Sequence, residues 1–127
     1  MSCTMIKKVY FFDSYAIIEI IKGNANYYRY ADATIVTTKL NLFEVYYTLL
    51  KLHSEKDADK FLERSSSFVI DYDLSIIKEA AIMKLTNQKK NISLTDCIGY
   101  CTALKLRIPF LTGDKEFEHF KNVTFVK

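Results

Sequence analysis

The chain has 127 residues, half of them hydrophobic, and a formal net charge of +3 at pH 7. This length is typical of one domain with one core, so we expect a single domain over residues 1–127. With three Gly, one Pro and an aromatic share of 14%, the composition excludes a disordered or low-complexity chain. The charge is compatible with a polyanionic ligand and equally with an ordinary protein surface.

No stretch of about 18 apolar residues occurs, and the first residues run directly into a strand-like segment. We therefore expect no membrane span and a cytoplasmic protein. Three cysteines, Cys3, Cys97 and Cys101, are an odd number, which favours buried free thiols. A zinc site would need a closer cysteine pair or a nearby histidine, and His53 and His119 stand isolated in the sequence.

The first half of the chain alternates strand-like and helical patterns. In chain order they predict a strand at 9–12, a helix that ends at Gly23, a short helix at 24–31, a strand at 34–38 and helices at 40–52 and 54–64. The helix at 40–52 is apolar nearly all round, so we expect it to be buried. The helix at 54–64 is mostly charged and should lie on the surface.

The second half continues this alternation. It predicts a strand at 68–70, helices at 74–85 and 93–104, a strand at 108–111, a short helix at 115–120 and a strand at 123–126. Strands that alternate with helices indicate an α/β fold with a mainly parallel sheet covered on both faces. Ligands of such sheets bind beyond the carboxyl ends of the strands, where the strand order reverses.

Glu44 stands inside the most apolar predicted helix, between Phe43 and Val45. Burial of an unpaired carboxylate is costly, so this side chain must meet a cation or a donor, or be protonated. The alternative is an exit to solvent along a narrow polar stripe shared with Asn41 and Lys51. We favour a functional role for Glu44 over that alternative.

Asp13, Asp96 and Asp114 each have a structural and a functional interpretation. Asp13 follows the first strand and can cap the next helix, Asp96 matches a capping box that begins at Ser93, and Asp114 can cap the short helix after it. All three also begin helices near strand ends, where they can converge with Glu44. Four carboxylates there would repel one another unless a hard divalent cation such as Mg²⁺ or Mn²⁺ intervened.

Four short segments occur in order along the chain: Phe11–Ser14, Asn41–Val45, Leu94–Leu104 and Leu111–Phe117. Together they resemble the PIN-domain family, in particular the toxin nuclease of a VapBC-type toxin–antitoxin pair. The resemblance covers essentially the whole chain. It implies a three-layer α/β/α sandwich around a mainly parallel sheet, Mg²⁺ or Mn²⁺ as the cofactor, and hydrolysis of RNA phosphodiesters.

The resemblance also assigns roles to residues. The metal-binding and catalytic acids would be Asp13, Glu44, Asp96 and Asp114, with Ser14 and Thr112 as polar helpers. Tyr15 and Cys97 depart from the residues common in the family and leave this acid set intact.

Several residues near these acids are candidates to bind the substrate. We expect Lys115, beside Asp114, to bind RNA, with Arg29 and Lys39 as further basic candidates and Tyr15 available for stacking. A metal-activated water needs no protein nucleophile, and the two histidines are expected to be structural or surface residues.

The resemblance implies protein partners as well, a second copy of the chain and a small antitoxin that covers the acidic pocket. For the dimer, the apolar surplus makes the helices at 16–31 and 40–52 the candidates.

Two other functions of small α/β proteins need acids that this chain lacks. A receiver domain would need an acidic pair after the first strand, and a phosphatase that uses an Asp-x-Asp nucleophile would need a second Asp after Asp13. A PIN nuclease of RNA processing without an antitoxin stays open. So does a non-catalytic PIN-fold binding module.

Overall fold

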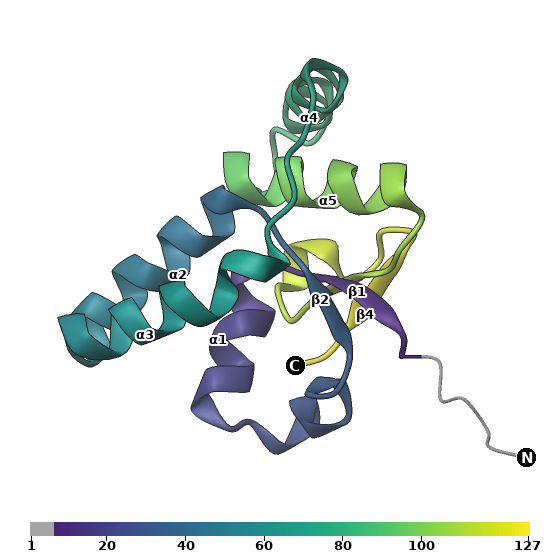
Figure 1. The fold of residues 1–127 in the computed structure, drawn as a ribbon. Coiled ribbons are helices and arrows are strands. Elements are labelled where there is room, and N and C mark those ends of the chain that lie inside the picture. The colour runs from purple at the N-terminus through teal and green to yellow at the C-terminus, as the bar shows by residue number, and fades with distance from the viewer. Residues whose placement is uncertain (1–6) are drawn as a thin grey trace, which may run out of the picture.

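The computed structural model describes residues 7–127 and contains a four-stranded, fully parallel sheet (Figure 1). Its strands are β1 (Val9–Phe12), β2 (Thr34–Val36), β3 (Phe110–Thr112) and β4 (Val123–Phe125). The order β2-β1-β3-β4 means that the chain leaves β1 toward one edge and later returns to the other side of it. The strand order therefore reverses between β1 and β3, at whose carboxyl ends ligands of such sheets bind.

Five α-helices and three short 3₁₀ helices connect these strands in the described part of the chain. They are α1 (Ser14–Lys22), η1 (Ala25–Tyr30), α2 (Lys39–Leu52), α3 (Glu55–Ser65), η2 (Ser66–Phe68), α4 (Leu74–Thr86), α5 (Leu94–Leu106) and η3 (Lys115–Phe117). Each α-helix begins at a Ser, Thr or Asp whose side chain accepts from a backbone N–H of the first turn. Within residues 7–127, none of the helices has the length and apolar content that a membrane crossing requires.

The sheet separates two apolar cores, because successive side chains of a strand point to opposite faces. Phe11 and Phe110 pack with α4 and α5, whereas Phe12 and Leu111 pack with α1, η1, α2 and α3. Gly99 lets α5 approach the sheet, since a Cβ there would lie 2.9 Å from Cε1 of Phe11. The predicted three-layer α/β/α fold is confirmed.

The predicted strand at 68–70 is wrong. Residues 66–68 form η2, and only a single parallel bridge, Thr37 to Val69, follows it. This segment runs past the end of β2 and does not extend along it, so it forms no ladder. The short helices predicted at 24–31 and 115–120 are 3₁₀ helices at 25–30 and 115–117.

The prediction that the helix at 40–52 is buried is also wrong. Leu42, Val45 and Leu49 are buried, but Phe43 and Tyr47 are exposed. The reason is that α2 lies in an outer layer and packs inward with one face only. Its apolar outer face is left to solvent.

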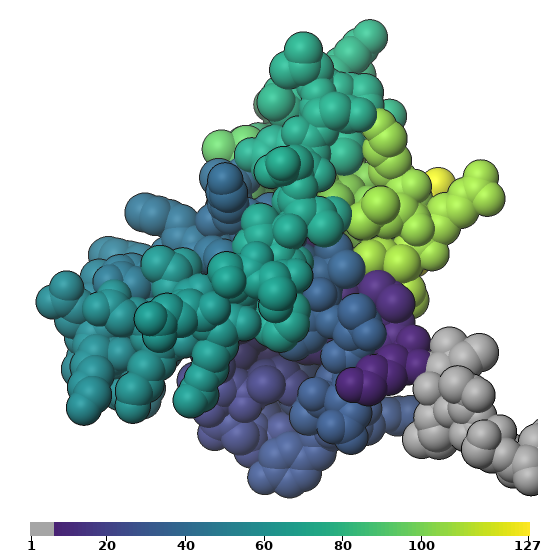
Figure 2. Space-filling view, in the orientation of Figure 1, coloured from purple at the N-terminus to yellow at the C-terminus, as the bar shows by residue number. Residues whose placement is uncertain are grey.

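Free, buried thiols are confirmed for Cys97 and Cys101, and burial raises the pKa of both. Cys3 lies outside the described residues. In the space-filling view the helix α4 projects from the body of the molecule beyond α5 (Figure 2).

Candidate functional site

Asp13 lies at the carboxyl end of β1, directly beside the end of β3. Its backbone N–H donates to the carbonyl of Leu111 at 3.2 Å, which continues the pairing of the two strands. Its side chain is 1% exposed. Oδ1 accepts from the N–H of Ala16 at 2.8 Å, and Oδ2 accepts a hydrogen bond from the hydroxyl of Thr112. Asp13 is therefore a helix cap and, at the same time, a buried carboxyl at the point where the strand order reverses.

Thr112 connects Asp13 to the second acid, Asp114. The N–H of Asp114 donates to Oγ1 of Thr112 at 3.0 Å, while Oδ1 of Asp114 accepts from the N–H of Glu116 at 3.0 Å. Residue 113, between Thr112 and Asp114, has to be glycine, because a Cβ there would lie only 2.1 Å from Cε1 of Tyr15. Tyr15 is thus packed beside the site and partly buried.

Glu44 reaches the site from α2. It is partly buried, and its Oε1 accepts from the hydroxyl of Ser14 at 2.5 Å. Nδ2 of Asn41 donates to that hydroxyl at 3.1 Å, and the Thr38 hydroxyl donates to Oδ1 of Asn41 at 2.7 Å. Asn41 and Thr38 are fully buried, so Asn41 belongs to no solvent-facing stripe.

Sequence reasoning missed Thr38 and Asn41 as parts of this arrangement. The sequence feature that could have revealed them is Asn41, a second polar residue inside an apolar helix, one turn before Glu44. Its side chain and that of Thr38 hold Ser14 in place to donate to Glu44.

Asp96 occupies the first turn of α5. It forms the predicted capping box with Ser93, whose hydroxyl accepts from the N–H of Asp96 at 3.1 Å while Oδ2 of Asp96 accepts from the Ser93 N–H at 3.4 Å. The helix α5 packs against β1 and β3 and also contacts α2. This packing brings Asp96 toward the acids that follow those strands.

Burial and mutual repulsion raise the pKa of two of these acids. Burial is the main cause that raises the pKa of Asp13 to about 8, and the hydrogen bonds from Thr112 and Ala16 oppose this rise. The negative charges of Asp96 and Asp114 raise the pKa of Asp13 further. Burial likewise raises the pKa of Asp96 to about 6, opposed by Ser93 and reinforced by Asp114 and Glu44. Asp13 therefore lies close enough to Asp96 and Asp114, and Asp96 close enough to Glu44, for the neighbouring charge to disfavour ionisation.

The donors fit a hard divalent cation in their chemistry. All four are carboxylates, and bound Mg²⁺ or Mn²⁺ would stabilise the ionised forms that burial and repulsion disfavour. Within residues 7–127, however, no three His, Cys, Asp or Glu side chains stand at the spacing of a ready-made metal cluster. The carboxyl groups of these acids thus do not surround one common point in this structure. His53 and His119 are both exposed.

The fold and this geometry define a class: a parallel three-layer α/β/α protein with acidic side chains where the strand order reverses. The sequence profile of the PIN domain matches residues 10–123. The chain therefore belongs to the PIN domain family. A comparison with curated protein sequences finds no match.

Several solved structures share the fold. One is a toxin–antitoxin complex from Klebsiella pneumoniae, with 22% identity, a TM-score of 0.70, and 90% of this chain and 94% of that chain covered. A second is VapC20 from Mycobacterium tuberculosis, described as a sarcin-ricin loop cleaving toxin, with 16% identity, a TM-score of 0.74, and 93% and 99% covered. VapBC2 from Rickettsia felis, solved with a DNA fragment from its promoter, has 17% identity, a TM-score of 0.69, and 94% and 99% covered.

Proposed function

We propose that this chain is a metal-dependent endoribonuclease and the toxin component of a type II toxin–antitoxin pair. The observation that carries the proposal is the buried Asp13 carboxyl, which Thr112 and Ala16 hold beside Asp96 and Asp114 at the reversal of strand order. Membership of the PIN domain family supports a nuclease. Structural relatives described as toxins or toxin–antitoxin complexes support the toxin role.

The residues that would hold Mg²⁺ or Mn²⁺ are Asp13, Glu44, Asp96 and Asp114. An ion bound there would polarise the scissile phosphodiester and lower the pKa of a water molecule. The protein's own part is to orient the carboxylates: Thr112 and the N-terminus of α1 fix Asp13, and Ser14 fixes Glu44.

Lys115 is exposed and adjacent to Asp114 in sequence, so it is available to contact a phosphate of the RNA. We assign Lys115 a role in substrate binding.

The test is cleavage of a labelled RNA with Mg²⁺, with Mn²⁺ and with EDTA, by the wild type, Asp13→Asn and Asp73→Asn. Both aspartates cap an α-helix by accepting from the backbone N–H three residues on, so Asp73→Asn is the matched control. Asn caps a helix about as well as Asp but offers the metal no charge. We expect Asp13→Asn to lower the cleavage rate by about 100-fold or more and Asp73→Asn to leave it unchanged. Cleavage by Asp13→Asn at the wild-type rate would reduce Asp13 to a cap.

We also propose a small antitoxin as the physiological partner, and the cytoplasm as the place of action because the substrate is RNA. Co-expression with the product of a neighbouring small gene tests this. The antitoxin should co-purify with the chain and suppress its cleavage of RNA. A neighbouring product that neither binds nor inhibits would favour an RNA-processing nuclease.

A further inference from the structure

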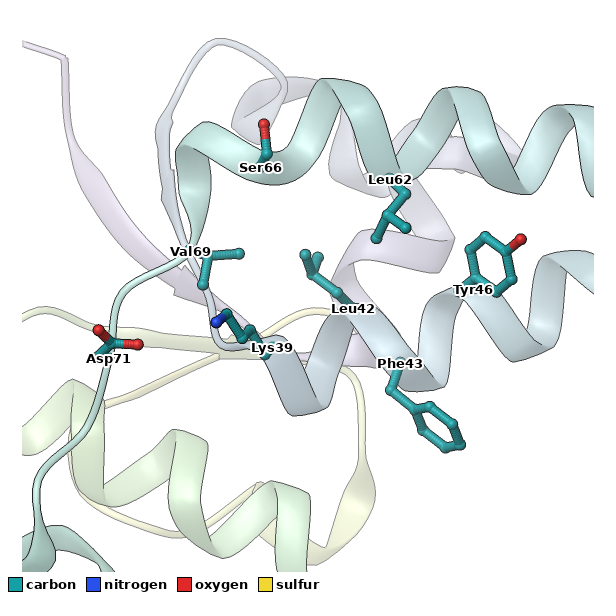
Figure 3. A pocket seen from close by; sticks show the side chains of 8 residues that line it. All are labelled: Lys39, Leu42, Phe43, Tyr46, Leu62, Ser66, Val69 and Asp71. Carbon is teal, nitrogen blue, oxygen red and sulfur yellow. The ribbon is translucent and has the colours of Figure 1, made fainter.

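Two exposed aromatic side chains, Phe43 and Tyr47, lie one turn apart on α2. Phe43 is 71% exposed and Tyr47 54% exposed. Their rings are parallel to within 4°, with centroids 6.5 Å apart. Figure 3 shows Phe43 pointing away from Leu42 and Leu62, which face each other across the groove between α2 and α3. The two rings therefore contribute little to the core.

A lysine flanks this aromatic pair on each side. Lys39, Phe43, Tyr47 and Lys51 follow one another at intervals of four residues, so they form one stripe along α2. Nζ of Lys51 lies 4.8 Å from the centroid of the Tyr47 ring. Lys39 and Phe43 both line the adjoining groove of about 660 Å³. All four side chains are exposed.

The stripe runs beside the candidate site. Glu44 follows Phe43 directly and precedes Tyr47 by three residues, so helix geometry places it about 60° round the axis from Tyr47. Its side chain reaches inward to Ser14, whereas the stripe faces solvent. A ligand held on the stripe would therefore lie next to an acid of the proposed metal site.

We propose that Lys39, Phe43, Tyr47 and Lys51 form a base-stacking platform that holds single-stranded RNA beside Glu44. The inference rests on the proposed function and adds the form of the substrate. Unpaired bases stack on exposed aromatic rings whatever their sequence, and lysines neutralise the phosphates between them. The paired cations favour a polyanion over an apolar protein segment, because the stripe itself contains no acid.

The binding test uses fluorescence anisotropy of a labelled single-stranded oligoribonucleotide in EDTA, where no cleavage occurs. We expect the Kd to rise about tenfold for Phe43→Ala and for Tyr47→Ala, because each removes one stacking surface. Tyr47→Phe keeps the ring and should keep the affinity. Leu52→Ala is the matched control, since Leu52 is 65% exposed and lies on the opposite side of α2. Replacing Lys39 or Lys51 with Ala should reduce the salt dependence of binding by about one released ion each.

The outcomes separate the platform from the proposed function. If the wild type cleaves RNA but Phe43→Ala/Tyr47→Ala binds it equally well, the platform is wrong and the nuclease stands. If the wild type binds RNA through the platform but never cleaves it, the platform stands and the nuclease is wrong. Light scattering on the same variants provides the third outcome: a loss of dimer mass with unchanged RNA affinity would make this stripe a contact between copies and overturn the platform.

Discussion

Asp13 combines a structural and a proposed chemical role in one carboxyl group. One oxygen caps α1 and the other accepts from Thr112, so the side chain is fixed before any ligand binds. The surroundings that fix it also remove it from water, which raises its pKa to about 8. A carboxyl group in this position is costly to ionise unless a cation is near.

This cost predicts a pH-dependent stability in EDTA. Between the unfolded pKa of 3.8 and the folded pKa of about 8, the folded state binds more protons at Asp13 than the unfolded state does. The contribution of Asp13 to stability is therefore greatest below pH 4 and falls as the pH rises toward 8, by a few kcal/mol as an order of magnitude. Asp13→Asn lacks this titration, so at pH 7 it should melt at a higher temperature than the wild type.

Thermal melts of both proteins between pH 4 and 8, in EDTA, measure the effect. The difference between the two proteins should grow with pH. Added Mg²⁺ or Mn²⁺ should stabilise the wild type and leave Asp13→Asn unchanged. A difference that is constant over this pH range would contradict the account.

Gly99 controls how closely the helix α5 lies on the sheet. A Cβ at this position would come within 2.9 Å of Phe11 and 3.3 Å of Phe110, whose rings are buried and stacked on each other. We expect Gly99→Ala to lower the free energy of unfolding by about 1–3 kcal/mol, despite the better helix propensity of Ala. Because α5 also holds Asp96, cleavage should fall as well.

Urea unfolding compares the free energy of unfolding of Gly99→Ala with that of Gly23→Ala. Gly23 ends α1 at φ +77° and has open space around it, so its substitution adds backbone strain without crowding. A stable, fully active Gly99→Ala would show that α5 does not need this close approach.

A second contact between elements joins α4 to α5. Nζ of Lys105 lies 2.6 Å from Oδ2 of Asp73, and this hydrogen bond, with those from Ser75 and Ile76, lowers the pKa of Asp73. The contribution to stability is therefore present above the unfolded pKa of 3.8 and is lost as the pH falls below it. Both side chains are exposed, so the effect should be small.

Lys105→Met should accordingly be slightly less stable than the wild type at pH 7, and this difference should shrink as the pH falls below 3.8 toward the lowered folded pKa of Asp73. Acid titration followed by circular dichroism compares the two. A larger difference in acid than at neutral pH would mean that Lys105 acts through packing of its stem.

The exposed apolar side chains indicate where the expected dimer could form. The sequence directs attention to the helices at 16–31 and 40–52, and the structure adds α4, where four apolar side chains are exposed. They are Leu74, Ile77, Ile82 and Leu85. Since α4 projects from the body, a two-fold partner can reach this surface (Figure 2).

We expect light scattering at micromolar concentration to give twice the 14.8 kDa of one chain. Leu74→Glu/Leu85→Glu on α4 should return the mass to that of one chain, because a buried unpaired charge disrupts an apolar interface. Leu52→Glu on α2 should keep the dimer. A wild type of 14.8 kDa at all concentrations would contradict the dimer.

The layered parallel fold, and the positions of Asp13 and Asp114 just after strands, follow from the sequence alone. Strand and helix periods are local, and parallel strands have their carboxyl ends at one edge of a sheet, so residues that follow strands are brought together whatever the packing details. The position of Asp13 after β1 and of Asp114 after β3 could thus be predicted. Their metal-binding role stays a prediction.

The side chains that hold the acids, and the surfaces that stay open to solvent, depend on how distant segments pack. Ser14 meets Glu44 from 30 residues away, and Thr112 meets Asp13 from 99 residues away, and no local pattern specifies such pairs. Packing of distant segments also explains why α2 exposes an apolar face and why no strand forms at 68–70. An apolar helix is buried only where another layer covers it, and a strand forms only where a neighbouring strand accepts its hydrogen bonds. Both conditions depend on how segments distant in the sequence pack together.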